Sequence, residues 1–447
     1  MFKDSVSYKL LGSDRVEEDS STIKRRASSV YSEYTDPALS GEPVLLNEAS
    51  SVSCMINLTN TIIGAGVLAL PYAVANSGSI LGIVLIVISG SMQIFSLHIL
   101  SVCAAKVPPP SSFYSVTQAS TPSLTVLIDL AVAIQSFGVC SSYFIVMGGL
   151  MPEVMNAFDI DGIWSSRLAW ILIGFSIVSP LSALHKLDAL KYTSGLSVLF
   201  VLFLTLLVLG FSIHGDGLHP CPSEDDGGCV GDKPYASVTN STFRVFSIFT
   251  NAFSCQSNIF GVVNEIRNPT QRRVDMVSTS SILAAGIIYG TVAMAGFYTF
   301  GDAVESNILL NYPNTHLTSV GRVCVSLLVA FSYPILLQPG RNSILGLWRF
   351  CDVDEESWIK YNSFRYALVT VVFLGGSLLT ALSVSDLGIV FSLVGATGAT
   401  MVSFILPGAA YYAMHQHEGE AWKRAGALAL SISGCVIMPV CLVFIFI

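Results

Sequence analysis

Residues 57–71 read NLTNTIIGAGVLALP, in which polar side chains and two glycines interrupt an otherwise apolar run. Irregular backbone survives in a bilayer only where it is buried in protein or lines a water-filled cavity. Because glycine has no Cβ, Gly64 and Gly66 let a helix unwind at small cost. The stretch predicts a broken transmembrane helix whose second half begins near Ala65. The alternative is an unbroken helix whose small residues pack closely against a neighbour.

A break at this point would expose main-chain groups of both half-helices to one space. The N–H groups at the start of the second half favour a carboxylate, because that end of a helix carries partial positive charge. The residues concerned are Ile63, Gly64, Ala65 and Gly66. The carbonyl groups released on the first half, with the side chain of Asn60 or Thr61, can hold a small cation.

A second polar interruption reads TNAFSCQSNIFG over residues 250–261. Polar side chains deep in a span are costly in lipid unless they face a cavity. The segment is therefore expected to face a ligand, with Phe253, Gln256 and Ser257 as candidate contacts. Irregular features in the first helix of each half point to a binding site between inverted repeats. The two stretches predict two five-span repeats, with broken helices 1 and 6, and one appended helix.

The composition supports a membrane protein. Of the 447 residues, 52% are hydrophobic and only 12% are charged, whereas soluble domains carry about 25% charged residues. Apolar stretches of roughly 20 residues, the length that crosses a bilayer, occur about eleven times. The fold class expected is an all-α membrane protein with about eleven transmembrane helices.

Residues 1–50 differ from the rest, because they are rich in Ser and charged residues and contain no apolar run of length. This composition predicts a disordered cytosolic tail ahead of a transmembrane domain at 51–447. Eighteen of the 22 Lys and Arg residues fall in the tail and in alternate loops, which places the N-terminus in the cytosol. Ser28 follows Lys24-Arg25-Arg26 and is a candidate phosphorylation site; the alternative is a basic cluster that only sets orientation.

Other polar residues permit several interpretations. Cys221 and Cys229 lie in a loop expected on the lumenal or extracellular side, where they would pair in an oxidising compartment; the alternative is two free thiols. Asp129 in the third span is a candidate for ion coupling, a packing anchor, or a side chain that reaches the interface. The sequence shows no nucleophile constellation and no repeated Cys or His cluster. We expect neither an enzyme, nor a cofactor, nor a nucleic-acid partner.

The motifs resemble those of a known family. Residues 57–66, followed by Pro71-Tyr72-Ala73, look like the first span of the amino acid/auxin permease family. That family includes the sodium-coupled neutral amino acid transporters and the yeast vacuolar amino acid exporters. Asp129-Leu130-Ala131, Leu187 to Ser194 and Phe253-Ser254-Cys255 are also similar, and look closest to the vacuolar branch. The resemblance extends from about residue 51 to the end.

The resemblance implies secondary active transport of amino acids, with neutral ones expected, by alternating access coupled to H⁺ or Na⁺. In the sodium-coupled members, the residue matching Asn60 and a hydroxyl residue of span 8 help to bind the ion. Ser332 is the match to the second, so the only metal expected is Na⁺ at Asn60 and Ser332. A monomer in the vacuolar or lysosomal membrane is expected, with the plasma membrane as the alternative. The main alternative function is an amino-acid sensor (transceptor) that signals without appreciable flux, and a channel is the third.

Three positions depart from the vacuolar branch. Gln135 stands where that branch has Lys, Gly149 where it has Asp, and Gln256 where it commonly has His. Joint loss of the basic and the acidic residue spares the membrane an unpaired charge. Because glutamine does not titrate, no protonation role is expected at position 256.

Overall fold

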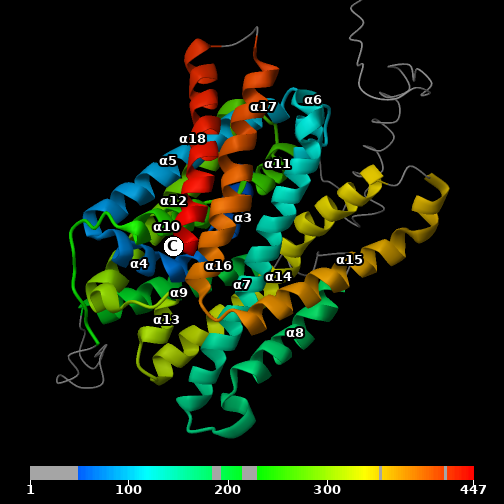
Figure 1. Cartoon of the computed structure of the whole chain (residues 1–447). Coiled ribbons are helices and arrows are strands. Elements are labelled where there is room, and N and C mark those ends of the chain that lie inside the picture. Colours follow the sequence, from blue (N-terminus) through cyan, green and yellow to red (C-terminus); the bar gives the residue numbers. More distant parts are fainter. Residues whose placement is uncertain (1–48, 184–192, 214–228, 352–354, 417–419) are drawn as a thin grey trace, which may run out of the picture. The chain divides into compact units, whose positions relative to one another are not determined.

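The computed structural model describes residues 49–183, 193–213, 229–351, 355–416 and 420–447. Within them the regular secondary structure is helical, apart from one isolated parallel bridge between Ala49 and Ile266 (Figure 1). The helices are α3 (Ser51–Ile62), α4 (Gly66–Ser77), α5 (Ser79–Ala104), α6 (Phe113–Ser120), α7 (Thr125–Asn156), α8 (Arg167–Ala183), α9 (Thr193–Ile213), α10 (Asn240–Ala252), α11 (Gln256–Glu265), α12 (Gln271–Phe300), α13 (Ile308–Asn311), α14 (His316–Cys351), α15 (Glu355–Ser383), α16 (Leu387–Val394), α17 (Leu406–Met414) and α18 (Ala421–Phe446).

Eight helices of the described chain are long and apolar enough to cross a membrane. They are α5, α7, α9, α12, α14, α15, the continuous α16–α17 and α18. The bent pair α3 and α4 makes a ninth candidate. The all-α membrane class is confirmed. The predicted count of eleven is not: it also requires α8, which is apolar but only 17 residues long, and the polar pair α10–α11 to cross.

Both predicted breaks are present. The axes of α3 and α4 differ by 56°, and the second half begins at Gly66, one residue after the predicted start. The other break separates the end of α10 at Ala252 from the start of α11 at Gln256. A Cβ on Gly66 would lie 3.3 Å from the Cα of Ala252. A side chain at position 66 would therefore require the two breaks to move apart by a few tenths of an ångström.

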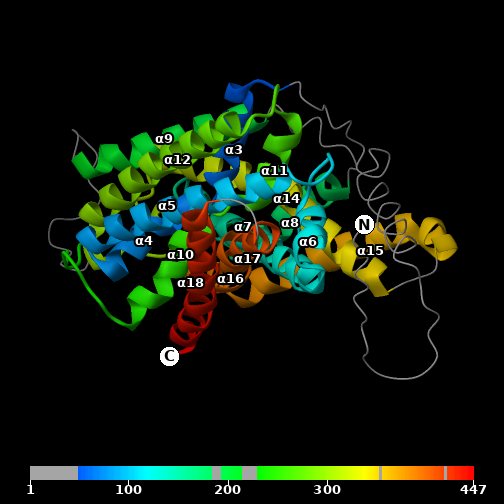
Figure 2. The same cartoon turned by 90° about the horizontal axis from the view of Figure 1, so that it is seen from above.

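The helix contacts repeat in a paired pattern. α12 packs against α3 and α4, and α5 packs against α11 and α10. In the same way, α7 contacts α8, α15 and α16, while α14 contacts α15, α8 and α9. Each contact has its counterpart if α3–α9 correspond in order to α10–α17, as an inverted repeat requires. The α9–α12 and α5–α17 pairs are counterparts too, and the first of them is visible in Figure 2. α18 is the appended helix and packs on α17 and α10.

The segment between α16 and α17 contains two π-helical turns, Gly395–Ala399 and Met401–Ile405. Turns of this kind often occur at functional sites. A Cβ on Gly395 would lie 2.0 Å from the carbonyl oxygen of Ser247 in α10, and one on Gly398 would lie 2.7 Å from the amide nitrogen of Gln135 in α7. These glycines therefore let α10 and α7 pack close to the π-helical segment between α16 and α17.

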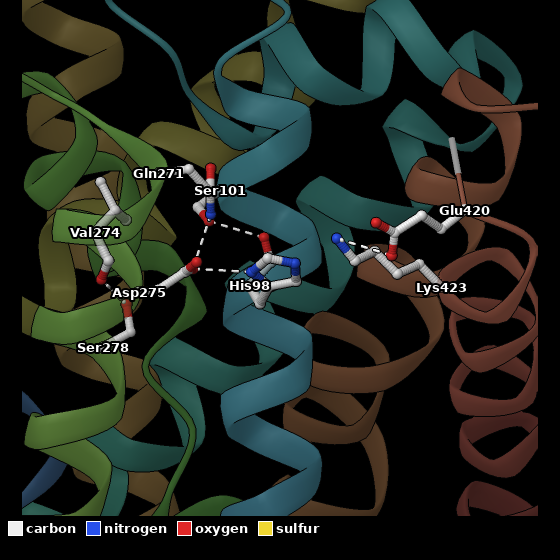
Figure 3. Close-up of polar contacts among 8 residues, drawn as sticks. All are labelled: His98, Ser101, Gln271, Val274, Asp275, Ser278, Glu420 and Lys423. Carbon is white, nitrogen blue, oxygen red and sulfur yellow. Dashed lines mark hydrogen bonds and ion pairs between the residues drawn. The ribbon is translucent and has the colours of Figure 1, made fainter. Parts of the chain in front are cut away.

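A polar network joins α5 to α12 near the end of the bundle at which α3 begins. The Nδ1 of His98 lies 2.9 Å from the Oδ1 of Asp275, and Gln271 donates hydrogen bonds to the same carboxylate and to the hydroxyl of Ser101. Figure 3 shows these side chains pointing toward one another from the two helices. His98 thus pairs with Asp275 to link α5 to α12, away from the two breaks.

Glu305 lies in the turn between α12 and α13, outside the candidate spans. Partial burial, and then repulsion from the carboxylates of Glu153 and Asp386, raises the pKa of Glu305. The folded protein therefore binds this proton more tightly than the unfolded chain, so stability falls as pH rises through the two pKa values.

We expect Glu305→Gln to raise the Tm at about pH 7, and to leave it nearly unchanged below about pH 4, where the native carboxyl is itself protonated. Thermal unfolding of the detergent-solubilised protein across this range measures the difference. Asp161→Asn, in an exposed turn with no side-chain cap hydrogen bond, is the matched control. An equal, pH-independent shift in both variants would contradict the argument.

Candidate functional site

A cavity of about 70 Å³ lies where the two breaks meet. A cavity of this volume has room for roughly five water molecules. Its wall is formed by the two broken helices together with α7, α14 and α16. None of the described residues on this wall is charged or a histidine. Its polar members are Thr61, Gln135, Ser136, Tyr143, Asn251, Ser254 and Ser257.

Main-chain donors open into this cavity at the first break. The N–H groups of Ile63 and Gly64 already bond to carbonyls of α3, those of Thr59 and Ile62. Those of Ala65 and Gly66, which both line the cavity, have no acceptor within the described chain. These two N–H groups start α4, where the helix dipole favours negative charge.

Main-chain and side-chain acceptors face the same space. The carbonyl oxygen of Thr61, a wall residue, receives no hydrogen bond from described residues. Asn251, at the end of α10, is a wall residue of the cavity. Its Oδ1 is buried and has no hydrogen-bond partner among the described residues. Because a buried acceptor without a partner is costly, this oxygen points to a ligand that donates.

The predicted ligand contacts divide into two groups. Gly64, Ala65, Gly66 and Ser257 line the cavity. The other three, Ile63, Phe253 and Gln256, are buried away from its wall.

Phe253 fills a slot behind the second break. Its ring stacks edge-on against Tyr289, with the centroids 5.0 Å apart. Cβ atoms built on Gly90 of α5 and Gly286 of α12 would each lie 3.8 Å from this ring. Phe253 therefore packs between these two helices.

Gln256 forms hydrogen bonds on both sides of its carboxamide and is only 1% exposed. Its Nε2 donates to the Oε1 of Gln93 on α5. Its Oε1 accepts from the hydroxyl of Ser403, at 2.8 Å, and from the N–H of Cys255, at 3.1 Å. Gln93 in turn donates to the carbonyl of Thr250 in α10, at 3.2 Å. The polar side chain at this position thus holds the second break in place through hydrogen bonds to neighbouring helices.

Of the four predicted ion-coupling residues, only Thr61 lines the cavity. Thr61 lines it and donates to the carbonyl of Asn57 at 2.9 Å. Asn60 and Ser332 are half-buried and do not contribute to its wall. Ser332 precedes the wall residue Leu336 by one helical turn, so it lies on the same face of α14. Asp129 interacts with the Ser343 hydroxyl, away from the wall.

The wall also contains residues that the sequence pattern did not single out as contacts. Tyr143 and Ser136 of α7 are among them, as are Leu336 and Phe391. In α7 the wall residues recur every three or four positions, which marks one helix face. Nothing in the sequence tells which face of α7 meets the breaks. Asn251 was recognisable, because it lies in the polar run of the second break.

Two predicted features lie wholly or partly outside the described residues. Ser28 falls in the undescribed N-terminal part, and Cys221 falls between 214 and 228. The pairing of Cys221 with Cys229 and the phosphorylation of Ser28 stay predictions.

Two broken helices that meet at an uncharged cavity between inverted repeats define the class of this protein as a secondary transporter fold. The family model described as transmembrane amino acid transporter protein matches residues 47–447. The chain belongs to this family, and the expected membership is confirmed.

Two relatives agree with this assignment, and a solved structure shares the fold. The chain is 33% identical to vacuolar amino acid transporter 5 of Schizosaccharomyces pombe, covering 89% of this chain and 95% of the relative. It is 33% identical to vacuolar amino acid transporter 6 of Saccharomyces cerevisiae, covering 88% and 98%. The crystal structure of MhsT in complex with L-phenylalanine aligns with a TM-score of 0.57 at 11% identity, covering 90% of this chain and 99% of that one. This last likeness concerns the fold.

Proposed function

We propose that this protein moves neutral amino acids across a membrane by alternating access, coupled to H⁺ or Na⁺. One observation carries the proposal: three residues of one uncharged wall have unused polar groups, the N–H groups of Ala65 and Gly66 and the buried Oδ1 of Asn251. The N–H groups suit a carboxylate and the oxygen suits an ammonium group, which together make the head group of an amino acid. An acidic or basic side chain would find no opposite charge on the described wall.

The ligand contacts proposed are Gly64, Ala65, Gly66 and Ser257, together with Asn251. Ile63 is not proposed as a direct contact, because it lies off the wall and its N–H already bonds to the carbonyl of Thr59. Phe253 and Gln256 take positioning roles behind the wall instead of direct contacts.

The membrane proposed is that of the vacuole or lysosome, with the N-terminus in the cytosol. Two relatives are vacuolar transporters by name. The end of the bundle at which α3 begins also carries the basic residues Lys106, Arg267, Arg272, Arg273, Lys423 and Arg424, as the cytosolic side does. On the opposite side, we propose that Cys229 pairs with Cys221. We propose a monomer, with Ser28 as a modification site of the tail.

Flux in liposomes tests the function. The purified protein is reconstituted, and uptake of each of the twenty tritiated L-amino acids is measured with imposed Na⁺ and pH gradients. We expect saturable, gradient-dependent uptake of neutral amino acids. Uptake confined to acidic or basic amino acids would contradict the substrate class. Saturable binding without flux would contradict transport and favour the sensor.

Coupling is proposed at Asn60, with Thr61, Ser332 and Asp129 as further candidates. We expect Asn60→Ala to weaken the dependence of uptake on the driving ion about tenfold, because one hydrogen-bonding or ion-binding group contributes about 1.4 kcal/mol. The measurement is initial uptake as a function of Na⁺ concentration and of pH. Asn57→Ala, an exposed residue of the same helix, is the control. Unchanged responses to both Na⁺ and pH in Asn60→Ala would reject the role.

A further inference from the structure

Tyr289 of α12 contacts both breaks without lining the cavity. Its side chain is 0% exposed. Its hydroxyl oxygen lies 2.6 Å from the carbonyl oxygen of Ile62 and 2.9 Å from that of Ala252. Ile62 is the last residue of α3, and Ala252 is the last residue of α10. One hydroxyl hydrogen is therefore shared between the carbonyl ends of the two half-helices.

The meeting of these two helix ends requires a donor. The C-terminal end of a helix carries partial negative charge, so two such ends repel each other where they converge. The tyrosine hydroxyl donates between them and offsets that repulsion. Its position is fixed, because the Tyr289 ring packs edge-on against Phe253. The Phe253 ring is held in turn between α5 and α12, beside Gly90 and Gly286.

The contact has a counterpart in the other repeat. Gln93 lies eleven residues before Ala104, the end of α5, and Tyr289 lies eleven residues before Phe300, the end of α12. Gln93 donates to the carbonyl of Thr250 in α10, as Tyr289 donates to that of Ile62 in α3. The second helix of each repeat thus binds the broken helix of the other.

We infer that the Tyr289 hydroxyl is a positioning group that sets the spacing between the two broken helices. Ile62 and Ala252 both line the cavity, next to the open N–H groups of Ala65 and Gly66 and next to Asn251. Their separation sets how far the carboxylate-binding groups lie from the ammonium-binding oxygen. The expected effect of Tyr289 on transport rests on the proposed function. The expected effect of Tyr289 on the backbone at the breaks does not.

The first test removes the hydroxyl alone. In Tyr289→Phe we expect the KM for the best-transported tritiated amino acid to rise about tenfold, with the maximal rate changed less than about twofold, since one lost hydrogen bond of about 1.4 kcal/mol acts on binding geometry. p-Aminophenylalanine at position 289 restores N–H donors at the same place and should restore the wild-type KM. Tyr333→Phe is the control, because it removes another fully buried hydroxyl, one that bonds to Ser377 rather than to a break. Its KM should stay unchanged.

The second test needs no flux. Hydrogen–deuterium exchange of the detergent-solubilised protein is followed in peptides covering 57–71 and 247–260. Tyr289→Phe should speed exchange in both peptides about tenfold, and Tyr333→Phe in neither. Unchanged exchange at both breaks would overturn the inference even if no amino acid is transported. Wild-type flux with an unchanged KM in Tyr289→Phe would overturn it while leaving the proposed function standing.

Discussion

Replacement of Gly64 by leucine is expected to abolish amino acid uptake while leaving the protein folded and inserted. A Cβ on Gly64 would already lie 3.2 Å from the hydroxyl of Tyr143 across the cavity. The rest of a leucine side chain would have to enter the cavity of about 70 Å³ or displace that tyrosine. Overpacking costs about 1–3 kcal/mol, and the upper value corresponds to a loss of uptake of about 100-fold.

Initial uptake in liposomes measures this loss, and monodisperse elution in detergent checks folding. Gly375→Leu in α15 is the matched control, because a Cβ at that position meets no atom within 4 Å. It should transport at close to the wild-type rate. Normal uptake by Gly64→Leu would remove the site from the first break.

Replacement of Gln256 by leucine is expected to give the largest loss of stability among single substitutions near the breaks. Leucine keeps a similar volume but leaves the Oε1 of Gln93 and the N–H of Cys255 without a partner. It also removes the amide acceptor of the Ser403 hydroxyl, which keeps its contact with Ser254. A buried polar group without a partner costs about 1–3 kcal/mol, whereas hydrogen bonds between membrane helices average about 0.6 kcal/mol. The combined loss of the hydrogen bonds of Gln256 should lower the free energy of unfolding by about 3 kcal/mol.

Denaturant unfolding in detergent micelles measures the change. Gln338→Leu in α14 provides the matched control, since that half-buried side chain makes no hydrogen bond within the described chain. We expect its stability to stay within about 0.5 kcal/mol of wild type. If the two variants lost equal stability, the network around Gln256 would have no special role at the second break.

The breaks were predictable because their cause is local. Gly64, Gly66 and the polar residues beside them make a continuous lipid-facing helix unfavourable in any context. The first break consequently lies within one residue of its predicted place. The inverted repeat followed from finding two such stretches, one in each half.

The directions of individual side chains were not predictable in the same way. A polar residue in a span must find partners, and Gln256 could have met them in a cavity or in other helices. Gln93 and Ser403, which supply them, lie about 160 and 150 residues away in the sequence. The roles of Tyr143 and Tyr289 at the breaks were also not predictable, because the residues that they contact there are distant in the sequence.

The uncharged wall of the cavity has an electrical consequence. A zwitterion without a charged side chain carries no net charge, and none of the described residues around it contributes one. Moving such a solute therefore takes no work from the membrane voltage, which acts on ions with about 2.3 kcal/mol per elementary charge for each 100 mV. If uptake is coupled to H⁺ or Na⁺ as proposed, the current that accompanies uptake of a neutral amino acid counts the coupled cations. The ratio of charge to labelled amino acid in a voltage-clamped membrane then reads out the stoichiometry of transport.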